Sequence, residues 1–62
     1  MNQDRLIEVV KNDASLFNAK FYGYADVVMN HVNEHHLDSG EEPVTMEEAQ
    51  AALDAIKKAK SA

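Results

Sequence analysis

The chain has 62 residues, with 6 lysine or arginine residues against 11 aspartate or glutamate residues and a formal net charge of -5. This length allows one domain with a small core, and such domains commonly need a disulfide, a metal or self-association for stability. The absence of cysteine excludes disulfides, thiolate zinc sites and cysteine nucleophiles, and the acidic balance disfavours an independent nucleic-acid-binding domain, which normally carries a basic surface.

The first segment, residues 3–12, is predicted to be a helix. Asn2 is suited to cap it, and Asp4 places an acid in the first turn, where the helix dipole favours negative charge. Leu6 and Val10 recur at helical spacing. Charged residues interrupt the segment, so it does not have the apolar region of a signal peptide. No apolar run approaches the roughly 20 residues of a membrane-spanning helix, and we therefore expect a cytoplasmic protein without a membrane partner.

A long central helix is predicted over residues 14–36, a stretch that contains all the aromatic side chains. At about 100° per residue, one apolar stripe connects this segment with the first. Its members are Leu6, Val10, Ala14, Phe17, Phe21, Tyr24, Val28 and Val32. The unbroken phase favours one continuous helix, with this stripe as the core. Asn12 and Asp13, however, compete for backbone hydrogen bonds and favour a break at this point. Both alternatives remain open from the sequence.

A second apolar line runs beside the first and is the predicted interface with another helix. Ala19 and Gly23 are four residues apart and would let a second backbone approach closely, within the chain or across a dimer. The alternative is a tolerated glycine on a solvated face, because glycine weakens a helix prediction. The predicted interface residues are Val9, Leu16, Ala19, Tyr22, Gly23 and Val27.

The last part of the sequence predicts a connection followed by a second helix. Gly40 and Pro43 interrupt helical structure between residues 37 and 44. Thr45 and Glu48 then match the capping box, a reciprocal pair of hydrogen bonds at a helix N-terminus. Apolar residues at helical spacing and a lysine-rich final turn extend the predicted helix over residues 45–60.

The histidines are the only candidate metal ligands that the sequence singles out. His31 and His35 are four residues apart, so a continuous helix would place both rings on one face, where two positions of a zinc site could be filled. The other interpretation is that both are helix-end residues, where an imidazolium complements the dipole. His36 is not expected to share a partner with His35. We therefore expect no bound metal or other cofactor.

No arrangement of hydroxyl, carboxylate and imidazole groups predicts a catalytic site, so we do not expect an enzyme. No motif indicates a family. The expected fold is all-α, a helical hairpin or three-helix bundle that forms a homodimer along the central helix. The expected function is a non-enzymatic interaction or regulatory protein, an accessory protein of a bacterium or phage that contacts itself and an unidentified protein. The alternatives are a dimeric nucleic-acid-associated regulator that gathers Arg5, Lys11 and Lys20 on one surface, and a histidine metal-binding module.

Overall fold

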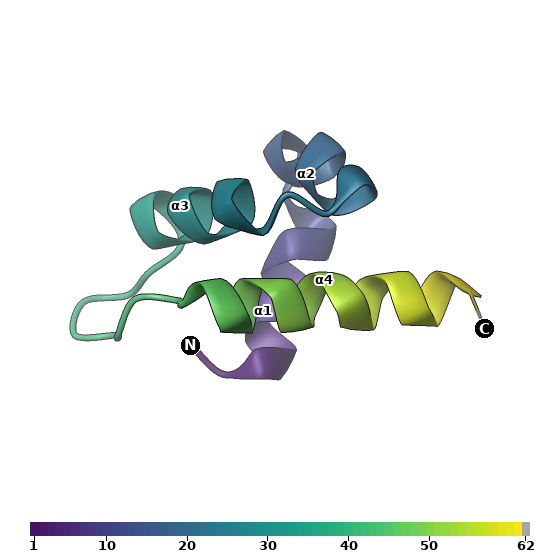
Figure 1. The fold of residues 1–62 in the computed structure, drawn as a ribbon. Coiled ribbons are helices and arrows are strands. Elements are labelled where there is room, and N and C mark those ends of the chain that lie inside the picture. Colours follow the sequence, from purple (N-terminus) through teal and green to yellow (C-terminus); the bar gives the residue numbers. More distant parts are fainter. Residues whose placement is uncertain (62) are drawn as a thin grey trace.

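The structure is a computed structural model that describes residues 1–61. The described chain is all-helical, which confirms the all-α part of the predicted fold class (Figure 1). Its elements are α1 (Gln3–Asn12), the short 3-10 helix η1 (Ala14–Leu16), α2 (Phe17–Tyr22), α3 (Ala25–His35) and α4 (Met46–Ser61). Within residues 1–61, none of these helices has the length and apolar character needed to cross a membrane.

The helices pack around α4, which contacts both α1 and α3. The chain reverses direction between α3 and α4, so these two helices form an antiparallel hairpin, while α1 crosses behind α4 and α2 lies above it (Figure 1). The residues at their shared centre are apolar and nearly inaccessible to solvent. They are Leu6, Val10, Leu16, Ala19, Ala25, Val28, Val32, Val44, Ala49, Ala52, Leu53 and Ile56. Every helix therefore contributes to one core.

Asp13 separates the first two helical segments and decides between the two alternatives that the sequence left open. α1 ends at Asn12, and Asp13 has an extended backbone with φ -87° and ψ 109°. The Oδ1 atom of Asp13 accepts a hydrogen bond from the Ser15 amide at 2.9 Å. The aspartate thus caps η1, as expected for a side chain that bonds to nearby backbone amides. The chain breaks here, and the helices are not continuous.

Gly23 makes a second break, inside the stretch that was predicted to be one helix. Its backbone is left-handed, with φ 78°, a conformation that glycine adopts without the steric cost of a Cβ. The Tyr24 amide donates to the Ala19 carbonyl at 2.8 Å and closes the end of α2. The prediction of one helix over residues 14–36 is therefore wrong, because this stretch forms η1, α2 and α3.

Between the two breaks the two apolar lines exchange roles, whereas the stripe residues of α1 and α3 are buried as predicted. Phe17, Phe21 and Tyr24, predicted as core, are exposed, whereas Leu16 and Ala19, predicted as interface, are buried in the chain's own core. The physical reason is that each break changes the helix direction and rotates the following residues relative to the core. A phase of 100° per residue cannot be extended across such points.

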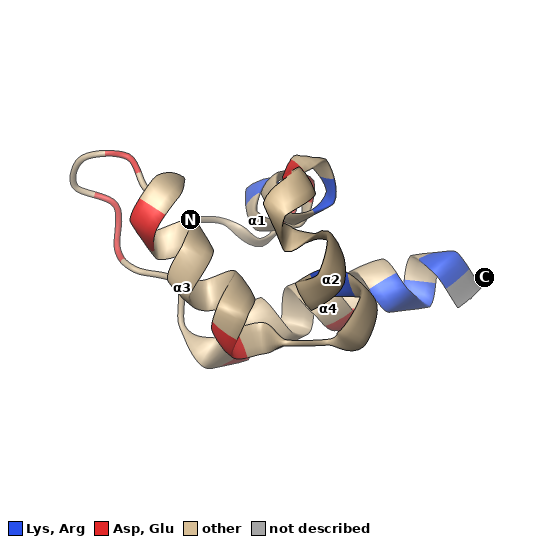
Figure 2. Ribbon diagram, turned by 90° about the horizontal axis from the view of Figure 1, so that it is seen from above, with Lys and Arg blue, Asp and Glu red and all other residues tan. Residues whose placement is uncertain are grey.

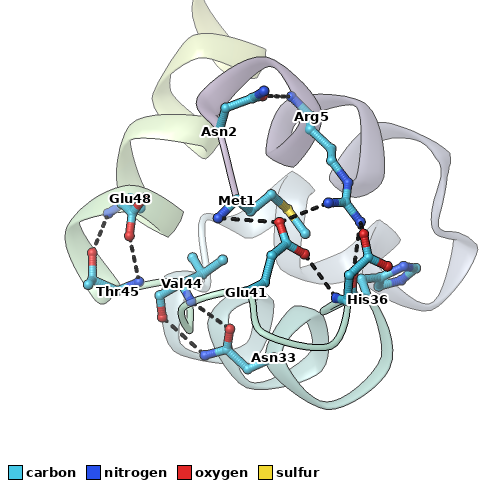
Figure 3. A network of polar contacts seen from close by, with 10 residues as sticks. Met1, Asn2, Arg5, Asn33, His36, Glu41, Val44, Thr45 and Glu48 are labelled. Atoms are coloured by element: carbon cyan, nitrogen blue, oxygen red, sulfur yellow. Dashed lines mark hydrogen bonds and ion pairs between the residues drawn. The ribbon is translucent and has the colours of Figure 1, made fainter.

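The start of α4 agrees with the sequence prediction. The Glu48 amide donates to Thr45 Oγ1 at 3.1 Å, and the Thr45 amide donates to Glu48 Oε1 at 3.1 Å (Figure 3). This is the predicted capping box. Just before it, Asn33 of α3 bonds to both backbone groups of Val44. The Asn33 Nδ2 atom donates to the Val44 carbonyl at 3.0 Å, and the Val44 amide donates to Asn33 Oδ1 at 2.7 Å. The connection is thereby attached to α3.

Candidate functional site

Four aromatic side chains on and after α2 form a continuous exposed surface, which we call the aromatic surface. Phe17, Phe21, Tyr22 and Tyr24 are 58%, 64%, 64% and 51% exposed, respectively. Their rings contact one another in sequence. The ring centroids lie 6.2 Å apart for Phe17 and Phe21, 5.1 Å for Phe21 and Tyr22, and 5.9 Å for Tyr22 and Tyr24. A small monomer seldom exposes large apolar groups together unless they contact a partner.

A hollow between α2 and α4 adjoins the aromatic surface. Phe21, Tyr22 and Gly23 line it on the α2 side, and Leu53 and Ile56 contribute from α4. Lys20, Lys57 and Lys60 also line it, and Asp54 is the one acidic residue of its lining. Figure 2 shows the lysines along the C-terminal part of α4, whereas acidic residues follow the connection at the other end of the molecule. The charge is thus locally basic beside the aromatic surface, although the whole chain has a net charge of -5.

The predicted interface residues do not form one surface. Tyr22 and Val27 are exposed, and Gly23 lies at the turn that follows α2. Val9 is partly buried against the core, while Leu16 and Ala19 are buried as described above. No helix face therefore joins Ala19 to Gly23. Helical periodicity predicted Phe17, Phe21 and Tyr24 to be core residues and so did not identify them as surface residues. Their clustering around a glycine, within eight residues, was the signal that could have revealed them.

Two histidines meet at the carboxylate of Asp13. Asp13 Oδ2 lies 2.7 Å from His31 Nε2 and 2.6 Å from His36 Nε2. His31 belongs to α3, His36 is the C-cap residue of α3, and Asp13 precedes η1. All three side chains are partly buried, at 25%, 31% and 14% exposure for His31, His36 and Asp13. The structure thus joins residues that are far apart in the sequence.

The candidate metal ligands that the structure brings together are those of this cluster, and not the pair His31 and His35 that the sequence suggested. The rings of His31 and His35 are near each other, with centroids 4.6 Å apart, but His35 is exposed and its Nε2 atom lies 4.0 Å from Glu34 Oε2. On a continuous helix, His31 and His36 would point about 140° apart. His36 reaches Asp13 because α3 ends there, with φ -121° and ψ -3° at this residue. The sequence therefore offered no helical spacing that would have found it.

The carboxylate of Asp13 is held in its ionised form. The hydrogen bond from His36 is the main cause that lowers its pKa far below the ordinary value, and the Ser15 amide and His31 lower it further against the opposing effect of desolvation. An ionised carboxylate only accepts hydrogen bonds, so both Nε2 atoms act as donors toward Oδ2. The cluster is a charge-assisted contact that links the α1–η1 junction with the end of α3.

Arg5 is engaged in a second polar network, at the other side of His36. Its guanidinium contacts Glu41 Oε2 at 2.8 Å, Asp38 Oδ2 at 3.0 Å and the His36 carbonyl at 3.3 Å (Figure 3). The N-terminal ammonium also lies 3.5 Å from Glu41 Oε2. Two carboxylates thus surround the guanidinium of Arg5, which is one of the three basic residues of the predicted nucleic-acid surface.

Stability is expected to fall at acidic pH partly through Glu41. The Asp38 amide donates to Glu41 Oε1, and this bond, together with the charges of Arg5 and the N-terminus, lowers the pKa of Glu41 below 4.5. A lowered folded-state pKa stabilises the protein above the unfolded-state pKa, and this contribution is lost as pH falls through the folded-state pKa. Urea unfolding between about pH 5 and about pH 3 should therefore show a smaller loss for Glu41→Gln than for wild type. The exposed neighbour Glu42→Gln is the control and should behave as wild type.

Comparisons with protein-family models, with curated proteins and with solved structures found no significant match. The functional interpretation therefore depends on the geometry of the aromatic surface and of the polar cluster.

Proposed function

We propose that this protein is a non-enzymatic interaction protein that acts by binding an acidic, amphipathic segment of another protein on the aromatic surface. The proposal is carried by one observation: four aromatic rings within residues 17–24 are each more than half exposed, and each contacts the next. Aromatic side chains dominate the central parts of protein interfaces, because they bury much apolar area at low cost in conformational entropy.

The charge around the hollow indicates what kind of partner fits. Three lysines and one aspartate line it, so a partner with carboxylates beside its apolar residues would gain complementary charge. The Lys20 ammonium also lies 5.7 Å from the centre of the Phe17 ring and extends the positive charge to the aromatic surface. An amphipathic helix with apolar and acidic faces meets both requirements, since such helices commonly dock in apolar grooves.

A second copy of the chain fits this surface less well than an acidic partner. In a twofold dimer the same patch meets itself. Pairing the aromatic surface with its own copy would bring the lysine rims of two protomers together, and like charges at an interface oppose association. The homodimer expected from the sequence is the competing use of the aromatic surface. The experiment below distinguishes it from binding of an acidic partner.

The proposal is tested by titrating isotope-labelled protein with a synthetic helical peptide that has leucine on one face and glutamate on the other. We expect the amide resonances of α2 and of the C-terminal half of α4 to shift. A peptide with lysine in place of every glutamate should bind at least about tenfold more weakly. Equal binding of both peptides would contradict the charge argument. Concentration-dependent shifts without peptide would show self-association, and binding of oligothymidylate would favour the nucleic-acid alternative.

Phe21→Ser should weaken binding of the acidic peptide by about tenfold or more, because a central aromatic contact is lost. The fold should be retained, since the Phe21 side chain is mostly exposed. Met46→Ser is the matched control, because Met46 is also an exposed apolar residue but lies at the opposite end of α4 (Figure 1). Equal loss of binding in both variants would show that general hydrophobicity, and not the aromatic surface, binds the peptide.

A further inference from the structure

We propose that Asp13, His31 and His36 form a zinc-binding site. The metal-ligating atoms of these three side chains lie within 4.8 Å of one another. Two imidazole nitrogens and one carboxylate oxygen are a donor set that suits Zn²⁺, with water in the fourth position. Magnesium and calcium prefer sites built mainly from oxygen ligands, and this cluster offers oxygen from Asp13 alone among its three side chains.

The present geometry is close to that of a metal site. In a tetrahedral site with bonds of about 2.0–2.1 Å, neighbouring ligand atoms are about 3.3 Å apart. Asp13 Oδ2 is 2.7 Å and 2.6 Å from the two Nε2 atoms, so it must recede from each ring by roughly 0.7 Å. Each ring must also present an Nε2 lone pair, which requires its proton to move to Nδ1 or to leave with solvent.

The surroundings of Asp13 favour this role. The Ser15 amide holds Oδ1 at 2.9 Å, which orients the carboxylate and leaves Oδ2 directed at the two rings. Such hydrogen bonds to a ligand commonly support metal sites. Asp13 and His36 also border a surface hollow, together with Glu8, Asn12 and Ala14. The hollow provides access for the ion and for a water ligand.

Zinc at this position would link the α1–η1 junction, which precedes α2 in the chain, to the end of α3, which follows it. The segment between Asp13 and His31 contains the whole aromatic surface. A small domain without cysteine gains most from such a link, because metal binding to the folded state adds directly to folding stability. This inference is independent of the proposed peptide binding, since it involves different side chains and a different ligand.

The experiment is calorimetric titration of untagged protein with Zn²⁺ after removal of metals with a chelator, combined with thermal unfolding with and without zinc. We expect one zinc per chain and a higher Tm with zinc. His36→Gln and Asp13→Asn should each weaken zinc binding at least about tenfold. His35→Gln is the matched control, because His35 is adjacent to His36 but exposed and outside the cluster, and it should bind as wild type does.

Absence of saturable zinc binding by the wild-type protein would overturn the inference and leave a structural carboxylate–imidazole contact. Loss of binding in His35→Gln with retention in His36→Gln would overturn it as well, since the site would then be the helical pair His31 and His35. Should a cluster variant fail to fold by circular dichroism, the wild-type complex with Co²⁺ provides a second measurement. We expect the wild-type complex to show the strong visible absorption of four-coordinate cobalt, and we expect His35→Gln to retain it. The weak absorption of six-coordinate cobalt would contradict the proposed site.

Discussion

Leu16→Ala is expected to unfold most of the protein, whereas Phe17→Ala is expected to change its stability by less than about 1 kcal/mol. Leu16 is fully buried, at 0% exposure, and truncation of a buried leucine costs about 2–5 kcal/mol. A domain of this size rarely has more than about 3–5 kcal/mol of stability in total. Phe17, the next residue, is more than half exposed and would lose little apart from its contacts with Phe21 and Lys20.

Urea unfolding followed by circular dichroism measures both effects under the same conditions. Because the two residues are neighbours, the pair also tests the break at Asp13 directly. If the apolar stripe through Phe17 were the core, as the helical periodicity predicts, Phe17→Ala would be the more damaging change. A larger loss for Phe17→Ala than for Leu16→Ala would therefore contradict the packing described above.

Asn33→Ala is expected to lower the free energy of unfolding by about 2 kcal/mol, because it leaves two backbone groups without partners. The amide and the carbonyl of Val44 are both bonded to Asn33, at 2.7 Å and 3.0 Å. Val44 is itself buried in the core, so its backbone has limited access to replacement water. The loss should also loosen the connection before α4 and increase amide hydrogen exchange at Val44.

Asn30→Ala is the matched control for this prediction. Asn30 has the same side chain, lies one turn earlier on α3 and is exposed, so its replacement should cost less than about 0.5 kcal/mol. The two variants differ in the contact with Val44 and hardly in helix propensity. Equal stability of both, measured by urea unfolding, would show that the paired hydrogen bonds do not hold the connection.

The two proposed sites depend on the same interruption of the chain. Asp13 ends α1, caps η1 and brings its second carboxylate oxygen to His31 and His36. By redirecting the chain, it also buries Leu16 and leaves Phe17 on the surface. Zinc bound at Asp13 would thus act on the segment that carries the aromatic surface, and peptide binding measured with and without zinc would reveal any coupling between the two sites.

Local features of the sequence determined the all-helical class and the N-terminal ends of α1 and α4. Asn2 caps α1 through a hydrogen bond to the Arg5 amide at 2.7 Å, and Thr45 and Glu48 form the capping box of α4. These features could be predicted because cap, partner and apolar repeat lie within a few residues of one another. The same local competition for backbone amides made the break at Asp13 one of the two alternatives.

The tertiary structure alone decided which aromatic residues are exposed and which histidines meet Asp13. A left-handed turn at Gly23 and the end of α3 at His36 change the chain direction, and each change resets which side chains face the core. Helical periodicity describes neighbours along one axis and contains no information on how successive axes are oriented. The carboxylate of Asp13 comes from the α1–η1 junction and the rings of His31 and His36 from the end of α3. Their meeting therefore followed from the packing of helices and not from any spacing in the sequence.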